Sequence, residues 1–161
     1  MSDKGKMCWI ENNFYFRSRF YFLYIHLSNT LFMNENEIAR TLVDLCYRIH
    51  VKFGPGLLES VYEEVLCYEL KKIGWDFERQ KEIKVQHDGK ELGIGFRADI
   101  IVKKHVIIEI KSVENIHPVH PKQLLTYLRL TDLRLGLLVN FNVPLMKEGI
   151  RRVVNGLSEA A

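Results

Sequence analysis

Asp99, Glu109 and Lys111 are the residues whose types and spacing are best suited to chemistry. Two carboxylates held side by side repel each other, and burying either charge is unfavourable unless a cation compensates. A divalent ion provides that compensation, and oxygen ligands of this kind suit Mg²⁺ or Mn²⁺. A lysine on the same face can orient or deprotonate an attacking water, or stabilise negative charge on a phosphoryl group. These residues therefore predict a metal-dependent phosphodiesterase site.

Two segments with alternating apolar residues, 96–102 and 106–111, predict the β-hairpin that carries these side chains. A register that pairs Val102 with Val106 joins the apolar positions of both strands into one buried face. A shift by one residue would bring charged residues into the core. In this register the two carboxylates lie opposite each other on the face away from that core, and Arg97 lies opposite the lysine. An exposed hairpin held by ion pairs is the alternative, but the wholly apolar opposite face favours the site.

Two pairs of helical residues could add groups to this site. Glu59 and Glu63 are four residues apart, so they share one face of a predicted helix, and either could contribute another carboxylate. Gln123 and Tyr127 have the same spacing, and an amide and a phenol there could hold a phosphate, a water or a base edge. The ordinary interpretation of both pairs is that they are solvated or half-exposed helix residues.

The other potential metal ligands do not form a recognisable pattern. The three cysteines, Cys8, Cys46 and Cys67, lack C-x-x-C spacing, and their odd number indicates free thiols in a reducing compartment. His117 and His120 have no evident third nitrogen or thiolate ligand. We expect these histidines to be structural or to face the substrate.

Apolar periodicity and turn signals predict the elements that must position these residues. Asp88-Gly89 predicts the turn of a first hairpin. The predicted order of two helices, three strands, a helix, a strand and a helix indicates an α/β fold with a mixed central sheet flanked by helices. In chain order we expect two helices (36–52 and 57–73), three strands (77–85, 91–102 and 105–112), a helix (121–130), a strand (135–141) and a helix (145–154).

The chain of 161 residues has a mass of 19.0 kDa, a hydrophobic fraction of 47% and a formal net charge of +3. A chain of this size and composition can bury a real core in one domain. Its mildly positive charge permits a nucleic-acid partner without requiring one.

Residues 1–33 differ from the rest because they are rich in aromatic residues without regular periodicity. We expect an aromatic N-terminal extension there, and a folded domain over residues 34–161. The uncharged run 20–33 is too short to span a bilayer, so no integral membrane role is expected; a role at a membrane surface is a weaker alternative. Met33 is interpreted as the working start, because Asn34 and the acids after it form a helix-start signal.

Five motifs, in order, resemble those of the GxxExxY family, which is placed in the PD-(D/E)XK nuclease superfamily. The resemblance covers residues 36–155. Ala98 stands where the superfamily usually has a proline, a tolerable departure because the acid that follows, not the proline, binds the metal. The motifs are Gly56-Leu57-Leu58-Glu59-Ser60-Val61-Tyr62, Phe77-Glu78-Arg79-Gln80, Arg97-Ala98-Asp99, Glu109-Ile110-Lys111 and Gln123-x-x-x-Tyr127.

This resemblance implies a restriction-endonuclease-like core with the active site on one hairpin. It also implies a nuclease that hydrolyses DNA phosphodiester bonds and depends on Mg²⁺ or Mn²⁺. By similarity, the metal ligands would be Asp99 and Glu109, with Glu59 completing the site; Lys111 would be the catalytic lysine; and Gln123 and Tyr127 would match the Q-x-x-x-Y element of RecB-like nucleases.

DNA is the expected partner, and RNA stays an alternative because no base-reading motif is visible. Arg79 and Arg97, together with Lys122 and Arg129, could contact phosphates, although their ordinary role is solvated surface charge. The alternative function is a catalytically silent nuclease-fold module that binds nucleic acid or a protein partner. A homo-oligomer is also left open, and the expected compartment is the cytoplasm.

Overall fold

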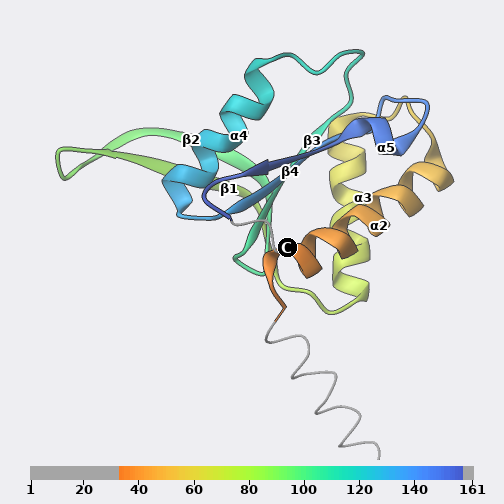
Figure 1. The fold of residues 1–161 in the computed structure, drawn as a ribbon, viewed down its shortest axis with the longest axis horizontal. Helices are drawn as coiled ribbons and strands as arrows, with labels where there is room; N and C mark the ends of the chain where they lie inside the picture. The colour runs from red at the N-terminus through yellow and green to blue at the C-terminus, as the bar shows by residue number, and fades with distance from the viewer. Residues whose placement is uncertain (1–32, 158–161) are drawn as a thin grey trace, which may run out of the picture. The chain divides into compact units, whose positions relative to one another are not determined.

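The computed structural model describes residues 33–157, so the predicted N-terminal extension lies outside the described residues except for Met33. Figure 1 shows a sheet with helices on both of its faces. The helices are α2 (Glu35–Phe53), α3 (Glu59–Lys72), α4 (Val119–Thr131) and α5 (Met146–Gly149), and the strands are β1 (Phe77–His87), β2 (Lys90–Val102), β3 (Val106–Lys111), β4 (Leu135–Asn140) and β5 (Ile150–Val154).

The strands form one sheet in the order β1-β2-β3-β4-β5. β3 and β4 are parallel, and the other neighbouring strands are antiparallel. A parallel pair needs a crossover connection, and the segment that contains α4 supplies it between β3 and β4. The predicted α/β fold with a mixed central sheet and flanking helices is confirmed.

Two local signals in the sequence have the predicted effect. Asn34 and Glu37 form a capping box at the start of α2: the Asn34 side chain accepts the Glu37 N–H at 3.0 Å, and the Glu37 carboxylate accepts the Asn34 N–H at 2.8 Å. Asp88 and Gly89 have φ values of 48° and 74° and form the tight turn between β1 and β2.

The predicted helix over residues 145–154 is wrong. Only Met146–Gly149 is helical, and Ile150–Val154 forms β5, which pairs antiparallel with β4. The apolar positions fit a helical period, but without a strand at this edge the main-chain groups of β4 would have no partners there. The β-branched residues of the segment also suit a strand.

Helices cover both faces of the sheet, α2 and α3 on one side and α4 on the other (Figure 1). On the α4 side, Ile101 and Ile107 pack in one cluster with Leu124 and Leu128. Every residue of β3 is buried except Lys111, the last one. The face that carries the carboxylates, predicted to lie away from the apolar face, is therefore also covered, because α4 packs over it, and periodicity within two strands does not reveal that contact.

Cys46 and Cys67 are buried free thiols, as predicted. Burial raises the pKa of Cys46 to about 12 and that of Cys67 to about 11, so both thiols stay protonated and unreactive at neutral pH. Cys8 lies outside the described residues.

Candidate active site

β2 and β3 hold two carboxylates at the point where their main-chain pairing ends. The register is the predicted one, and its last pair is Ile100 with Ile108. Beyond that pair, side chains replace main-chain partners: Asp99 Oδ2 accepts the Ile110 N–H at 2.8 Å, and Glu109 Oε1 accepts the Asp99 N–H at 3.3 Å. Each acid is therefore bonded to the opposite strand, and the two predicted metal-binding acids lie side by side.

The Lys111 ammonium lies among three oxygens of this hairpin. It is 3.3 Å from Glu109 Oε2 and 3.9 Å from Asp99 Oδ2, and it donates to the Ile110 carbonyl at 3.0 Å. The Lys111 side chain is only 18% exposed. A partly buried cation position with three oxygen neighbours therefore exists at the end of β3.

The buried carboxylates outnumber the lysine that neutralises them. Burial and the negative charge of Asp99 raise the pKa of Glu109 to about 7, although Lys111 acts in the opposite direction. Burial also raises the pKa of Asp99, and its hydrogen bond from Ile110 opposes that effect. An additional positive charge would relieve this excess, since an opposite charge nearby favours the ionised form of a carboxyl group.

Ser112 ties the end of β3 to the start of α3. Its N–H donates to Glu59 Oε1 at 2.9 Å, and its Oγ donates to the Leu57 carbonyl at 2.6 Å. The Glu59 carboxylate, which was predicted to join the site, is thus held by the residue that directly follows Lys111. Sequence reasoning missed Ser112, and its position directly after the lysine was the one available signal.

Tyr62 holds the loop that precedes α3. Its hydroxyl donates to the Gly54 carbonyl at 2.6 Å and accepts the Leu57 N–H at 3.3 Å. The ring is fully buried and stacks on Phe141, with centroids 4.2 Å apart. The motif that runs from Gly56 to Tyr62 therefore has a local structural purpose, because its tyrosine fixes the loop from which the α3 acids start.

Glu63 lies one turn after Glu59 and has different partners. Its side chain is 7% exposed and accepts hydrogen bonds from Arg79 and from Gln80, the latter at 2.6 Å. The Gln80 amide also lies 3.4 Å from Asp99 Oδ1. Gln80 belongs to a motif noted in the sequence, but no role was assigned to it there.

Gln123 and Tyr127 lie on α4 beside the carboxylates. The Gln123 amide donates to the Tyr127 hydroxyl. Burial raises the pKa of Tyr127, and the charge of Glu109 adds to this effect. The structure therefore brings this predicted pair together and places its phenol within electrostatic reach of the acids on β2 and β3.

His120 lies at the start of the same helix, in the neighbourhood of Lys111 and Glu59. Burial lowers its pKa, the charges of Lys111 and His117 act in the same direction, and the charge of Glu59 opposes them. His120 Nδ1 is buried without a hydrogen-bond partner in the described chain. Whether this histidine is structural or faces the substrate, the two roles expected from the sequence, stays a prediction.

Arg79 and Arg97, two of the residues expected to contact phosphates, have different surroundings. Arg79 donates to both Glu63 and Glu64, which raise its pKa above the usual range. The Arg97 side chain is 61% exposed and lies 3.8 Å from Glu82, its cross-strand neighbour on β1. The expected pairing of Arg97 with the lysine of β3 is not formed, because the ladder between β2 and β3 ends earlier.

Within residues 33–157, no group of three or more histidine, cysteine, aspartate or glutamate side chains is placed to hold a metal ion. No helix in this part of the chain is long and apolar enough to cross a membrane.

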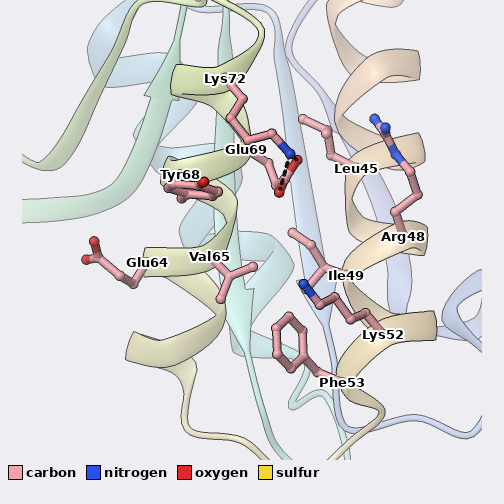
Figure 2. A pocket seen from close by; sticks show the side chains of 10 residues that line it. All are labelled: Leu45, Arg48, Ile49, Lys52, Phe53, Glu64, Val65, Tyr68, Glu69 and Lys72. Carbon is pink, nitrogen blue, oxygen red and sulfur yellow. Dashed lines mark hydrogen bonds and ion pairs between the residues drawn. The ribbon is translucent and has the colours of Figure 1, made fainter.

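A separate cavity of about 530 Å³ lies between α2 and α3 (Figure 2), and the hairpin acids and the lysine are not among its lining residues. It is lined by Leu45, Arg48, Ile49, Lys52, Phe53, Glu64, Val65, Tyr68, Glu69 and Lys72.

A family model described as the PD-(D/E)XK nuclease superfamily matches residues 36–153, which include every site residue discussed above. Neither the curated proteins nor the solved structures contain a match to this chain.

Proposed function

Because the chain belongs to the PD-(D/E)XK nuclease superfamily, we propose that it is a metal-dependent nuclease that hydrolyses DNA phosphodiester bonds at Asp99, Glu109 and Lys111. The mixed sheet with helices on both faces is consistent with a restriction-endonuclease-like α/β fold. Within the superfamily, we propose the GxxExxY family, on the motifs that the sequence contains.

The observation that carries this proposal is the set of three oxygens around one cationic group. Oxygens of Asp99, Glu109 and the Ile110 main chain surround the Lys111 ammonium at 3.0–3.9 Å. A cluster of oxygen donors around a positive charge is the environment that a hard divalent cation requires.

These donors fit Mg²⁺ or Mn²⁺. Asp99 and Glu109 together carry more negative charge than Lys111 neutralises, and the raised pKa of Glu109 reflects that excess. We expect these two carboxylates and the Ile110 carbonyl to hold the ion, with Glu59 completing the set as the resemblance implies. A bound ion would supply a Lewis acid that activates water and polarises a phosphoryl oxygen.

The side chains around the carboxylates would bind and orient the phosphodiester. Lys111 can donate hydrogen bonds to an anionic phosphoryl oxygen and stabilise the charge that develops there. Gln123 and Tyr127, already bonded to each other, can orient that phosphate or the attacking water. Arg97 is exposed enough to contact a neighbouring phosphate, whereas Arg79 would first have to leave its two glutamates.

A cleavage assay with the full chain tests this function. The protein should degrade single- or double-stranded DNA with Mg²⁺ or Mn²⁺ and not with EDTA, and RNA in parallel tests the alternative substrate. Asp99→Asn and Lys111→Ala should each reduce the rate by at least about 100-fold, because the first removes a carboxylate that holds the ion and the second removes the ammonium that stabilises charge on the phosphoryl group. Lys84→Ala is the matched control, since this lysine is exposed and paired with Glu91 on the β1–β2 hairpin.

Two outcomes would contradict the proposal in different ways. Cleavage that survives both site substitutions would reject the assigned residues. Absence of cleavage of every nucleic acid would reject the activity and leave the second candidate function.

That second candidate is a catalytically silent module that binds nucleic acid or a protein partner. Two observations favour it: the Lys111 ammonium already contacts the oxygens, and no third metal-binding side chain accompanies the two acids in the described residues. Calorimetry with Mg²⁺ and a DNA-binding assay separate the two functions. A silent module would bind DNA or a partner without binding the metal.

A further inference from the structure

Gln80 has a left-handed backbone in the middle of a strand. Its φ is 49°, while β1 extends on both sides of it from Phe77 to His87. Residues with a Cβ disfavour this conformation, which persists where surrounding contacts over-determine it. Strained residues of this kind cluster at functional sites, so the contacts of Gln80 need an explanation.

The register of the sheet puts Gln80 opposite a site carboxylate. Arg79 pairs with Ile100 and Lys81 pairs with Ala98, so Gln80 lies directly across from Asp99. Its Nε2 is 3.4 Å from Asp99 Oδ1. The strained residue and the proposed metal ligand therefore meet side chain to side chain.

This contact restricts the second oxygen of Asp99. Oδ2 is held by the Ile110 N–H at 2.8 Å, which alone leaves the carboxylate able to rotate about its terminal bond. The Gln80 amide acts on Oδ1, so the two donors together define the plane of the carboxylate. Hydrogen-bond partners of a metal-binding carboxylate act in this way, by orienting the ligand before the ion arrives.

The amide of Gln80 is itself held in place from α3. Glu63 Oε2 accepts from Gln80 Nε2 at 2.6 Å, and the other oxygen of Glu63 accepts from Arg79. The buried Glu63 therefore connects the Gln80 amide to the Arg79 guanidinium.

We propose that Gln80 is a positioning residue for a divalent cation at the proposed nuclease site, orienting Asp99 through its amide while Glu63 holds that amide. The inference rests on the proposed function, because it assigns Asp99 to the ion. It also accounts for the left-handed backbone, since this conformation lets the amide lie between the Asp99 and Glu63 carboxylates.

The test compares Mn²⁺ affinity, measured by calorimetry, in full-length variants. Gln80→Gly removes the amide and relieves the backbone strain, and we expect Mn²⁺ to bind about 10- to 100-fold more weakly, the usual effect of losing such a partner. Lys104→Gly is the matched control: it relieves the same strain at an exposed residue with φ 59° in the β2–β3 turn, and its affinity should equal that of the wild type.

A second variant, Gln80→Asn, provides the test if Gln80→Gly folds poorly. Asn tolerates a left-handed backbone, but its side chain is one methylene shorter, so Gln80→Asn should also weaken Mn²⁺ binding. The melting temperature of each variant, measured without metal, separates this effect from unfolding: each variant should remain folded at the temperature of the Mn²⁺ titration.

A metal-independent readout keeps the inference separate from the proposed function. The Gln80 side-chain amide resonances in a ¹H–¹⁵N spectrum should shift in Asp99→Asn and stay unchanged in Lys104→Gly. Wild-type protein that binds no Mn²⁺ would reject the proposed metal site itself. The positioning role would be overturned if the Gln80 variants bound Mn²⁺ with the same affinity as the wild type. It would also be overturned if the Gln80 amide resonances did not shift in Asp99→Asn.

Discussion

Burial and a neighbouring negative charge act together on the Glu109 carboxyl group. Its side chain is 7% exposed, and it lies beside another acid whose charge adds to the effect of burial on its pKa. Lys111 compensates only in part, so protonation of Glu109 begins near neutral pH. A proton and a metal ion therefore compete for the same carboxylate, and this competition can be measured.

The pH dependence of stability should report the raised pKa of Glu109. The folded protein holds this proton up to pH about 7, whereas the ordinary value is 4.5, so the free energy of unfolding falls as the pH rises between these values. We expect a loss of up to about 3 kcal/mol from this group at pH 8 relative to pH 5 without metal, and Glu109→Gln should abolish that part. Denaturant unfolding of both proteins in EDTA measures it; an identical pH dependence in the two would contradict the assignment.

The Tyr62 hydroxyl should stabilise the loop before α3. Tyr62→Phe keeps the stack on Phe141 but leaves the Gly54 carbonyl and the Leu57 N–H without this partner, so we expect a loss of about 1–3 kcal/mol. Tyr68→Phe on the same helix is the control, since Tyr68 is 61% exposed. Urea unfolding curves compare the variants, and equal stabilities would show that the hydroxyl does not hold the loop.

At the scale of elements, the position of α4 against β4 decides where Gln123 and Tyr127 lie. β4 has Gly136 where α4 crosses, and a Cβ there would lie 2.9 Å from Leu124 side-chain atoms. Leu124 is fully buried, so it has little room to move aside. The close approach of helix and strand therefore depends on this glycine.

Gly136→Ala should destabilise the protein by about 1–3 kcal/mol, the usual effect of overpacking a core. Thermal unfolding measures this change. Gly93→Ala is the matched control, because a Cβ at Gly93 meets no atom within 4 Å and Gly93 lies outside the helix contacts. A Gly136 variant as stable as the Gly93 variant would mean that α4 can shift without loss.

Elements also show how far local patterns predict this fold. The capping signal at Asn34 and the Asp88-Gly89 turn act within a few residues, and both were predicted correctly. The segment 150–154 was assigned to a helix because its apolar spacing fits one, yet it forms a strand. The free edge of β4 decides its structure, and that edge is not visible in a local pattern.

At the scale of the whole molecule, the proposed metal should couple the site to folding. A ligand that binds only the folded state stabilises it by RT ln(1 + [L]/Kd), about 2.7 kcal/mol at 100 times Kd. We expect Mn²⁺ to raise the melting temperature, more strongly at pH 8 than at pH 6, because protonated Glu109 binds metal poorly. Asp99→Asn should lose this response; a shift of equal size in that variant would place the ion elsewhere.

The sequence by itself determined that Asp99 and Glu109 face each other, because only one strand register joins the apolar residues of both strands on one face and a one-residue slip inverts both faces. It also identified Lys111 on the same strand, and the family motifs pointed to Glu59, Gln123 and Tyr127. Only the tertiary structure decided that Ser112 anchors Glu59, that Gln80 contacts Asp99 and that α4 covers the site face. Those contacts join elements far apart in the chain, so they depend on how helices pack on both faces of the sheet, which no local pattern encodes.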